Sequence, residues 1–79
     1  MRIPATPTNP ENIILTAAEN HRQIIEYLKS ASEYDDKSAV YLKKGNTEKA
    51  AECAVLAEEY IRLAGDVKIE DIKLHATYN

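Results

Sequence analysis

A long stretch without proline constrains the fold of this chain more than any other feature. All three prolines, Pro4, Pro7 and Pro10, fall within the first ten of its 79 residues. Proline removes a backbone donor and clashes with the preceding turn, so it is the strongest breaker of a helix interior. Residues 11–79 contain no proline and only two glycines. The sequence therefore predicts an all-α protein built from long helices.

The dipeptide Gly45-Asn46 predicts a sharp reversal within this stretch. Lys43 and Lys44 complement the negative end of a helix, which Gly45 can close in the left-handed conformation. Asn46 can cap a second helix, and Glu48 suits its first turn. Because the stop and start signals are adjacent, the connection is short, and short connections join antiparallel neighbours. We therefore predict an antiparallel helical hairpin.

The remaining signals divide the chain into an arm and one helical domain. Each proline disfavours helix at the residue before it, which predicts a flexible proline-rich arm over residues 1–9. Gly65-Asp66 provides a second stop and start. The short third helix that follows is expected to cover the first half of the first helix. The single domain spans residues 10–79, with helices predicted over residues 10–44, 47–64 and 66–76.

Apolar residues recur along the first two predicted helices at intervals of three and four, the spacing of a helix that packs on one face. The first helix, with Ser30-Ala31-Ser32 as its weak point, carries Ile14, Ala17, Ala18, Ile24, Ile25, Leu28, Ala31, Tyr34, Tyr41 and Leu42. The second carries mostly small residues: Ala50, Cys53, Ala54, Ala57, Tyr60, Ile61 and Ala64. Such an alanine-rich pair buries too little apolar area to offset the ordering of its residues. We therefore predict a homodimer that completes a larger bundle.

Three tyrosines form the most specific pattern after the turn. Tyr27, Tyr34 and Tyr41 repeat every seven residues, which places them on one line along the first helix. They can pack as core against the alanine face of the second helix. They can also form a half-exposed line at a protein interface, where tyrosine offers apolar area and a polar tip. We predict these three residues as the partner-binding residues, and both interpretations hold if the core continues across a dimer.

The middle of the chain has aromatic residues, small residues and a glycine turn in an order typical of one repeat family. The residues concerned are Tyr34, Ser38, Tyr41, Gly45, Asn46, Ala50, Ala54 and Ala57. Residues 31–64 thus resemble a single tetratricopeptide-type helical hairpin. Two positions depart from the pattern, because Ala54 stands where the family usually has a large residue and Arg62 where proline is common. The resemblance implies peptide or protein binding and no catalysis.

Few side chains point to chemistry. His21 lies among the apolar residues of the first helix, and Ala17 and Ile25 occupy the positions four residues away where a second metal ligand would stand. This predicts a partly buried, hydrogen-bonded histidine. Asp71 and His75 are four residues apart and could form half of a site, with no third ligand near them in the sequence. We therefore predict no catalytic residue, no cofactor and no metal site.

Charge and hydropathy limit the partners. The net charge is −3, and no basic cluster exceeds the pair Lys43-Lys44. Binding to nucleic acid or to an anionic membrane surface needs a basic footprint. No apolar run approaches the ~20 residues of a membrane span, and the first residues lack the apolar centre of a signal peptide. The single cysteine, Cys53, is expected to be a small buried residue and suits a reducing compartment, so we expect a cytoplasmic protein.

Three functions are compatible with these observations. The leading prediction is a small non-enzymatic protein–protein interaction module, such as an adaptor, a chaperone-like protein or a regulatory subunit. The second is a metal- or small-ligand-binding helical bundle that uses His21 together with Asp35. The third is a nucleic-acid-linked regulator, which the acidic charge disfavours.

Overall fold

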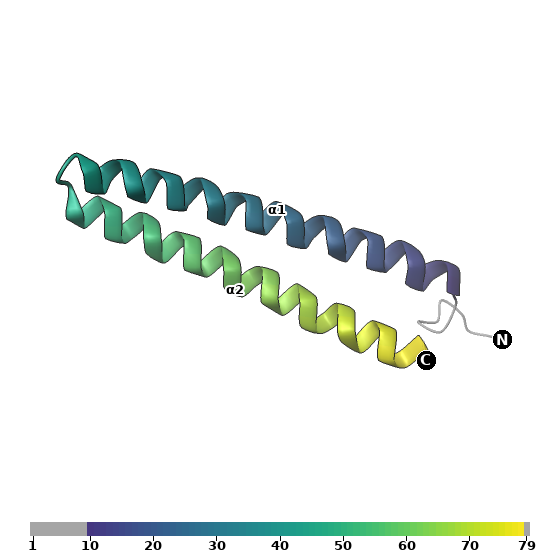
Figure 1. Cartoon of the computed structure of the whole chain (residues 1–79). Helices are drawn as coiled ribbons and strands as arrows, with labels where there is room; N and C mark the ends of the chain where they lie inside the picture. The colour runs from purple at the N-terminus through teal and green to yellow at the C-terminus, as the bar shows by residue number, and fades with distance from the viewer. Residues whose placement is uncertain (1–9, 79) are drawn as a thin grey trace.

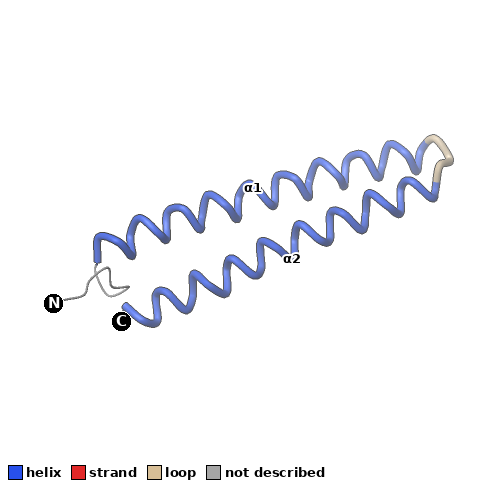
Figure 2. The backbone as a smooth tube through the Cα atoms, turned by 180° about the vertical axis from the view of Figure 1, so that it is seen from behind, coloured by secondary structure: helices blue, strands red, loops and turns tan. Residues whose placement is uncertain are grey.

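The chain folds as two long antiparallel helices joined by a tight turn (Figure 1). A computed structural model describes residues 10–78, so the predicted arm over residues 1–9 lies outside the described residues. Helix α1 spans Pro10–Lys43 and helix α2 spans Thr47–Tyr78. The turn occupies one end of the molecule, and the other ends of both helices lie together at the opposite end (Figure 2). The molecule measures 63 × 19 × 14 Å, which is the shape of an isolated hairpin.

The turn has the geometry that its sequence predicts. Gly45 has a φ of +82°, the left-handed conformation that closes α1. The amide of Asn46 donates to the Tyr41 carbonyl at 2.9 Å, and the amide of Gly45 donates to the Leu42 carbonyl at 3.0 Å. These two bonds form a Schellman motif, which satisfies carbonyls at the end of a helix. The Asn46 side chain then accepts a bond from the Lys49 amide at 3.2 Å and caps α2.

The predicted third helix is wrong, because residues 47–78 form one helix. Gly65 lies inside α2 with no positive φ, and a glycine within a helix costs only about 1 kcal/mol relative to alanine. Ala64 and Asp71, on either side of it, are buried, so contact with α1 offsets that cost. Arg62 also bonds Asp66 across the glycine at 3.2 Å. The tail does cover the first half of α1, but as a continuation of α2.

The helices meet along a seam with a strict seven-residue repeat. Alternating intervals of three and four define the a and d positions of a coiled coil. Every a and d position from residue 13 to residue 41 and from residue 50 to residue 74 is buried or half-buried. The seam residues of α1 are Ile13, Ala17, Asn20, Ile24, Tyr27, Ala31, Tyr34, Ser38 and Tyr41. Those of α2 are Ala50, Cys53, Ala57, Tyr60, Ala64, Val67, Asp71 and Leu74.

The core within this seam is thin. Five of the seven buried apolar residues are alanines, and the other two are Ile13 and Cys53. Among the described residues no large side chain is fully buried. The burial of Cys53 confirms its prediction. Ser30-Ala31-Ser32 causes no break, because Ala31 is a small residue packed in the seam of a continuous helix.

The predicted apolar stripe of α1 is only partly right. Ile13 is buried where the prediction chose Ile14, and five members of the predicted stripe are exposed: Ile14, Ala18, Ile25, Leu28 and Leu42. The prediction merged two neighbouring apolar lines, because both have intervals of three and four. One line is the seam, and the other lies beside it on the surface.

Candidate functional site

The hairpin has two broad sides that differ in chemistry. One side consists of the b and e positions of the heptad repeat and is called the apolar side. Its residues in α1 are Ile14, Ala18, His21, Ile25, Leu28, Ser32, Asp35, Ala39 and Leu42. Its residues in α2 are Ala51, Ala54, Glu58, Ile61, Gly65, Lys68, Ile72 and His75. The c and g positions form the opposite, charged side.

Contacts between the helices confirm that equivalent positions share a side. In an antiparallel pair the e positions of both helices lie on one flank of the seam and the g positions on the other. His21 and His75, both at e positions, reach the same carboxylate. Thr16 and Glu70, both at g positions, line one shallow hollow on the opposite flank. The apolar side is therefore one continuous surface over both helices.

Exposed large apolar side chains gather on the apolar side. The described residues include eleven exposed Ile, Leu and Val side chains, and six of them belong to this side: Ile14, Ile25, Leu28, Leu42, Ile61 and Ile72. Only Asp35, Glu58 and Lys68 carry a full charge there. The charged side, by contrast, carries an acidic or basic residue at more than half of its positions. Exposed apolar residues scattered singly are normal on a protein surface, but a contiguous line of them marks an interaction site.

The three predicted partner-binding tyrosines lie in the seam. Tyr27, Tyr34 and Tyr41 are all half-buried at d positions. The ring of Tyr60 lies 6.1 Å from that of Tyr27 and stacks at 5.8 Å on that of Tyr34. The Lys49 ammonium lies 5.7 Å from the centre of the Tyr41 ring. The structure thus places the tyrosines between α1 and α2, and their partner-binding role stays a prediction.

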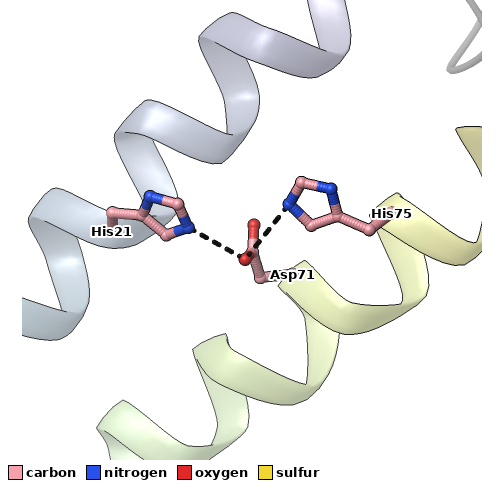
Figure 3. Close-up of side chains that lie close together, drawn as sticks. All are labelled: His21, Asp71 and His75. Atoms are coloured by element: carbon pink, nitrogen blue, oxygen red, sulfur yellow. Dashed lines mark hydrogen bonds and ion pairs between the residues drawn. The ribbon is translucent and has the colours of Figure 1, made fainter.

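A buried carboxylate interrupts the seam in the half of the hairpin away from the turn (Figure 3). The side chain of Asp71 occupies an a position and is only 5% exposed. Its Oδ1 accepts a hydrogen bond from Asn20 at 3.2 Å. Its Oδ2 lies 3.0 Å from Nε2 of His21 and 3.6 Å from Nε2 of His75. The two histidines approach the same oxygen from different helices, so this cluster ties the distal halves of α1 and α2 together.

The surroundings of Asp71 favour its charged form. Burial acts to raise the pKa of Asp71, but the hydrogen bonds from Asn20 and His21 and the charge of the two histidines outweigh it. The pKa of Asp71 is therefore lowered below its ordinary value. A buried carboxylate with these partners is satisfied, and its removal would leave polar groups without partners.

The structure corrects the predicted surroundings of the histidines. His21 is hydrogen-bonded as predicted, but its side chain is 58% exposed because it lies at the edge of the seam. His21 and Asp35 lie on the same continuous helix about 21 Å apart, so they do not meet within one chain, and their joint use in a bundle stays a prediction. The third group missing from the Asp71 and His75 pair is His21, which comes from the other helix.

Counting residues outward from the turn would have found this cluster. Moving 25 residues back from Gly45 reaches Asn20, and moving 25 residues forward from Asn46 reaches Asp71. The two lie side by side in an antiparallel hairpin without a break. The assumed stop at Gly65 hid this register.

Comparisons with known proteins provide no family and no relative from which a function could be inferred. No known family matches the chain, and neither a curated protein nor a solved structure is significantly similar to it. The resemblance to a tetratricopeptide-type hairpin is confirmed only as far as two antiparallel helices. A repeat of that family holds both helices within 34 residues, whereas α1 alone has 34. Within the described residues, neither helix combines the length and apolar character needed to cross a membrane.

Proposed function

We propose that this protein is a non-enzymatic interaction module whose apolar side binds helices of another polypeptide. The observation that carries the proposal is the group of six exposed Ile and Leu side chains at b and e positions, four of them on α1 and two on α2. The b and e positions themselves recur at intervals of three and four, which is the spacing of a second coiled-coil seam. A helix with two such neighbouring seams is suited to the interior of a bundle with more than two helices.

The dimensions of the apolar side support the same function. A surface 63 Å long and 19 Å wide is large enough for the roughly 800 Å² that each partner buries in a standard protein interface. Covering it would also add a core to a hairpin that has little of one. The tetratricopeptide resemblance, which implies protein binding, agrees with this proposal in direction. A role in nucleic-acid binding gains no support, because neither side carries a basic footprint.

A site-specific photo-crosslinker tests the proposal. We would attach it to Leu28→Cys on the apolar side or to Val40→Cys on the charged side, both with Cys53→Ala. The two positions are matched, because they lie on the same helix and are 46% and 49% exposed. Incubation with extract of the native host should give protein adducts from Leu28→Cys, including adducts with the chain itself, and few from Val40→Cys. Equal yields from both positions would contradict the proposal.

A second candidate function is the binding of a divalent metal ion such as Zn²⁺ at the Asp71 cluster. The ligand atoms of His21, Asp71 and His75 all lie within 4.8 Å of one another. Metal–ligand bonds of 2.0–2.1 Å in a tetrahedral site place ligand atoms about 3.3 Å apart. The observed separations of 3.0 and 3.6 Å to Asp71 lie on either side of that value. Asn20 holds the second carboxylate oxygen, as an outer partner of a metal ligand does.

Thermal unfolding with and without Zn²⁺ tests this second candidate. At a concentration of about 100 times the Kd, a bound ion stabilises a fold by about 2.7 kcal/mol, which raises Tm by roughly 15 °C in a domain of this size. His75→Gln should lose this shift, because it removes a ligand at the half-exposed rim and leaves the seam intact. The variant His21→Gln, which removes the ligand from α1, should lose it as well. A wild-type Tm that Zn²⁺ leaves unchanged would exclude a metal site.

A further inference from the structure

The apolar side of α1 is self-complementary when read in opposite directions. Its nine residues are centred on Leu28, with four on either side. If a second α1 lies antiparallel across this line, large apolar residues face large apolar residues at the ends and in the middle, and alanine faces alanine between them. His21 then faces Asp35 of the second copy, so a cation-forming group meets a carboxylate. The facing pairs are Ile14 with Leu42, Ala18 with Ala39, His21 with Asp35, Ile25 with Ser32, and Leu28 with itself.

The apolar side of α2 has the same property about a different centre. Its eight residues are centred at the height of Leu63. An antiparallel second copy places Glu58 opposite Lys68. The only two fully charged residues of this line then form ion pairs of opposite sign. The second copy also places the gap at Gly65 opposite the large side chain of Ile61. A Cβ built on Gly65 meets no atom within 4 Å, so this gap is open in the hairpin.

The two centres lie at the same height along the hairpin. Asn20 and Asp71 are in contact at 3.2 Å, and they fix the register of α1 against α2. Eight residues further along α1 is Leu28, and eight residues back along α2 is Leu63. Because the helices are antiparallel, these two positions lie side by side. A single two-fold axis that crosses both helices at this height therefore produces the facing pairs of α1 and the facing pairs of α2 together.

A different two-fold axis, parallel to the helices, does not match the charges. It would place α1 of one copy on α2 of the other, with both turns at the same end. At the register set by Asn20 and Asp71, His21 would lie between Lys68 and Ile72, and Asp35 would lie between Ala54 and Glu58. The carboxylates of Asp35 and Glu58 would then lie near each other, and His21 would lie near the Lys68 ammonium. Such arrangements are disfavoured, since mismatched charges suppress wrong pairings.

We propose that the polypeptide bound by the apolar side is a second copy of this chain. The two copies form an antiparallel four-helix bundle whose two-fold axis runs across the helices at the height of Leu28 and Leu63. This inference rests on the proposed function and names the partner. In the bundle α1 packs on α1, α2 packs on α2, and the two turns lie at opposite ends. The interface is isologous, so each charge pair occurs twice.

Spin labels at the turn distinguish the two axes. Sedimentation equilibrium first gives the mass, and Lys44→Cys with Cys53→Ala then carries the label. Lys44 lies 16 residues from the proposed axis, so the two labels in a dimer should be about 50 Å apart. With both turns at one end, the separation would be about 20 Å, the width of two helix layers. A dimer with the short distance would overturn the proposed axis and leave the interaction module intact.

A charge swap tests the same register through affinity. Glu58→Lys or Lys68→Glu alone should weaken the dimer about tenfold, because each creates two like-charge contacts. The double variant should return to within about threefold of the wild-type Kd. Glu26→Lys, on the charged side, serves as control and should change the Kd less than twofold. Failure of the double variant to recover contradicts the proposed pairing.

A monomer at all concentrations would overturn the inference that the partner is a second copy. Photo-crosslinking from Leu28→Cys then tests the broader proposal that the protein is an interaction module. Adducts with another polypeptide would keep the interaction module with a different partner. Absence of adducts in excess of those from Val40→Cys would remove the module as well.

Discussion

The two broad sides of this hairpin have the same backbone and opposite chemistry. Leu28 and Val40 lie on one helix with nearly equal exposure, yet Leu28 lies beside the exposed Ile25 on the apolar side and Val40 lies between Lys37 and Lys44 on the charged side. Both sides flank the same seam, so the hairpin alone does not require this difference. A hairpin that worked as a monomer would gain solubility from charges on both sides. The asymmetry therefore supports the proposal that a partner covers one side and that the other remains in water.

Placing a charge on each side should produce the largest contrast. Leu28→Glu puts two carboxylates next to each other on the proposed axis, away from water, and such burial costs several kcal/mol. We expect the Kd of the dimer to rise at least about 100-fold. Val40→Glu should leave it within about twofold. Sedimentation velocity over a concentration series measures both, and circular dichroism should show unchanged helix in each variant.

The polar cluster should be the most sensitive point of the hairpin itself. Asp71→Ala removes the acceptor shared by Asn20 and His21, and we expect a loss of about 1–3 kcal/mol in the free energy of unfolding. Asp35→Ala is the matched control, because Asp35 is an exposed aspartate of the apolar side. Its effect on unfolding at protein concentrations below the Kd should stay under about 0.5 kcal/mol. Urea denaturation of both variants gives the comparison, and equal losses would show that the cluster does not hold the helices together.

Acid should weaken the same cluster. The pKa of Asp71 is lower in the folded chain than its ordinary value, so its contribution is complete above the unfolded pKa. That contribution is lost as the pH falls through the folded pKa. The difference in unfolding free energy between the wild type and Asp71→Asn should therefore narrow between about pH 5 and about pH 2. A difference that is constant over this range would show that the charge of Asp71 does not stabilise the fold.

The two glycines should respond to alanine with small effects of opposite sign. Gly65 is helical with open space at its Cβ position, so Gly65→Ala should stabilise the hairpin by about 0.5–1 kcal/mol. Gly45 holds a φ of +82°, so Gly45→Ala should destabilise it by about 1–2 kcal/mol. Thermal melts of both variants at protein concentrations below the Kd of the dimer test whether Gly65 serves the hairpin. Loss of stability in Gly65→Ala would mean that α2 needs this glycine.

Local signals were enough to predict the hairpin. The continuity of α2 and the choice of seam residues required the register of one helix against the other. Gly45 and Asn46 act on their immediate neighbours, so their turn could be predicted from the sequence. Gly65 carries the same local signal, but contact with a distant part of α1 outweighs it. The choice between Ile13 and Ile14 also depends on the partner helix, because both fit a helical period. The repeat of Tyr27, Tyr34 and Tyr41, extended over both helices, would have resolved it.

The candidate site was hidden for the same reason. Asp71 and His75 were visible as a pair, and His21 as a single residue, but only the pairing of α1 with α2 joins them. The apolar side was not predicted, because the predicted stripe of the first helix merged five of its residues with the seam. Its extent became clear once the seam had been separated from the neighbouring line in α1. In both cases the missing information was the register of α1 against α2, which cannot be derived from local signals in a single sequence.

Thiol labelling compares the two sides most directly. Leu28→Cys and Val40→Cys, each with Cys53→Ala, would be reacted with a maleimide at increasing protein concentration. The account predicts that labelling of Leu28→Cys slows at least about tenfold as the apolar side becomes covered, while labelling of Val40→Cys stays constant. Equal rates for both thiols at every concentration, in the purified protein and in host extract, would contradict the claim that the apolar side is an interface.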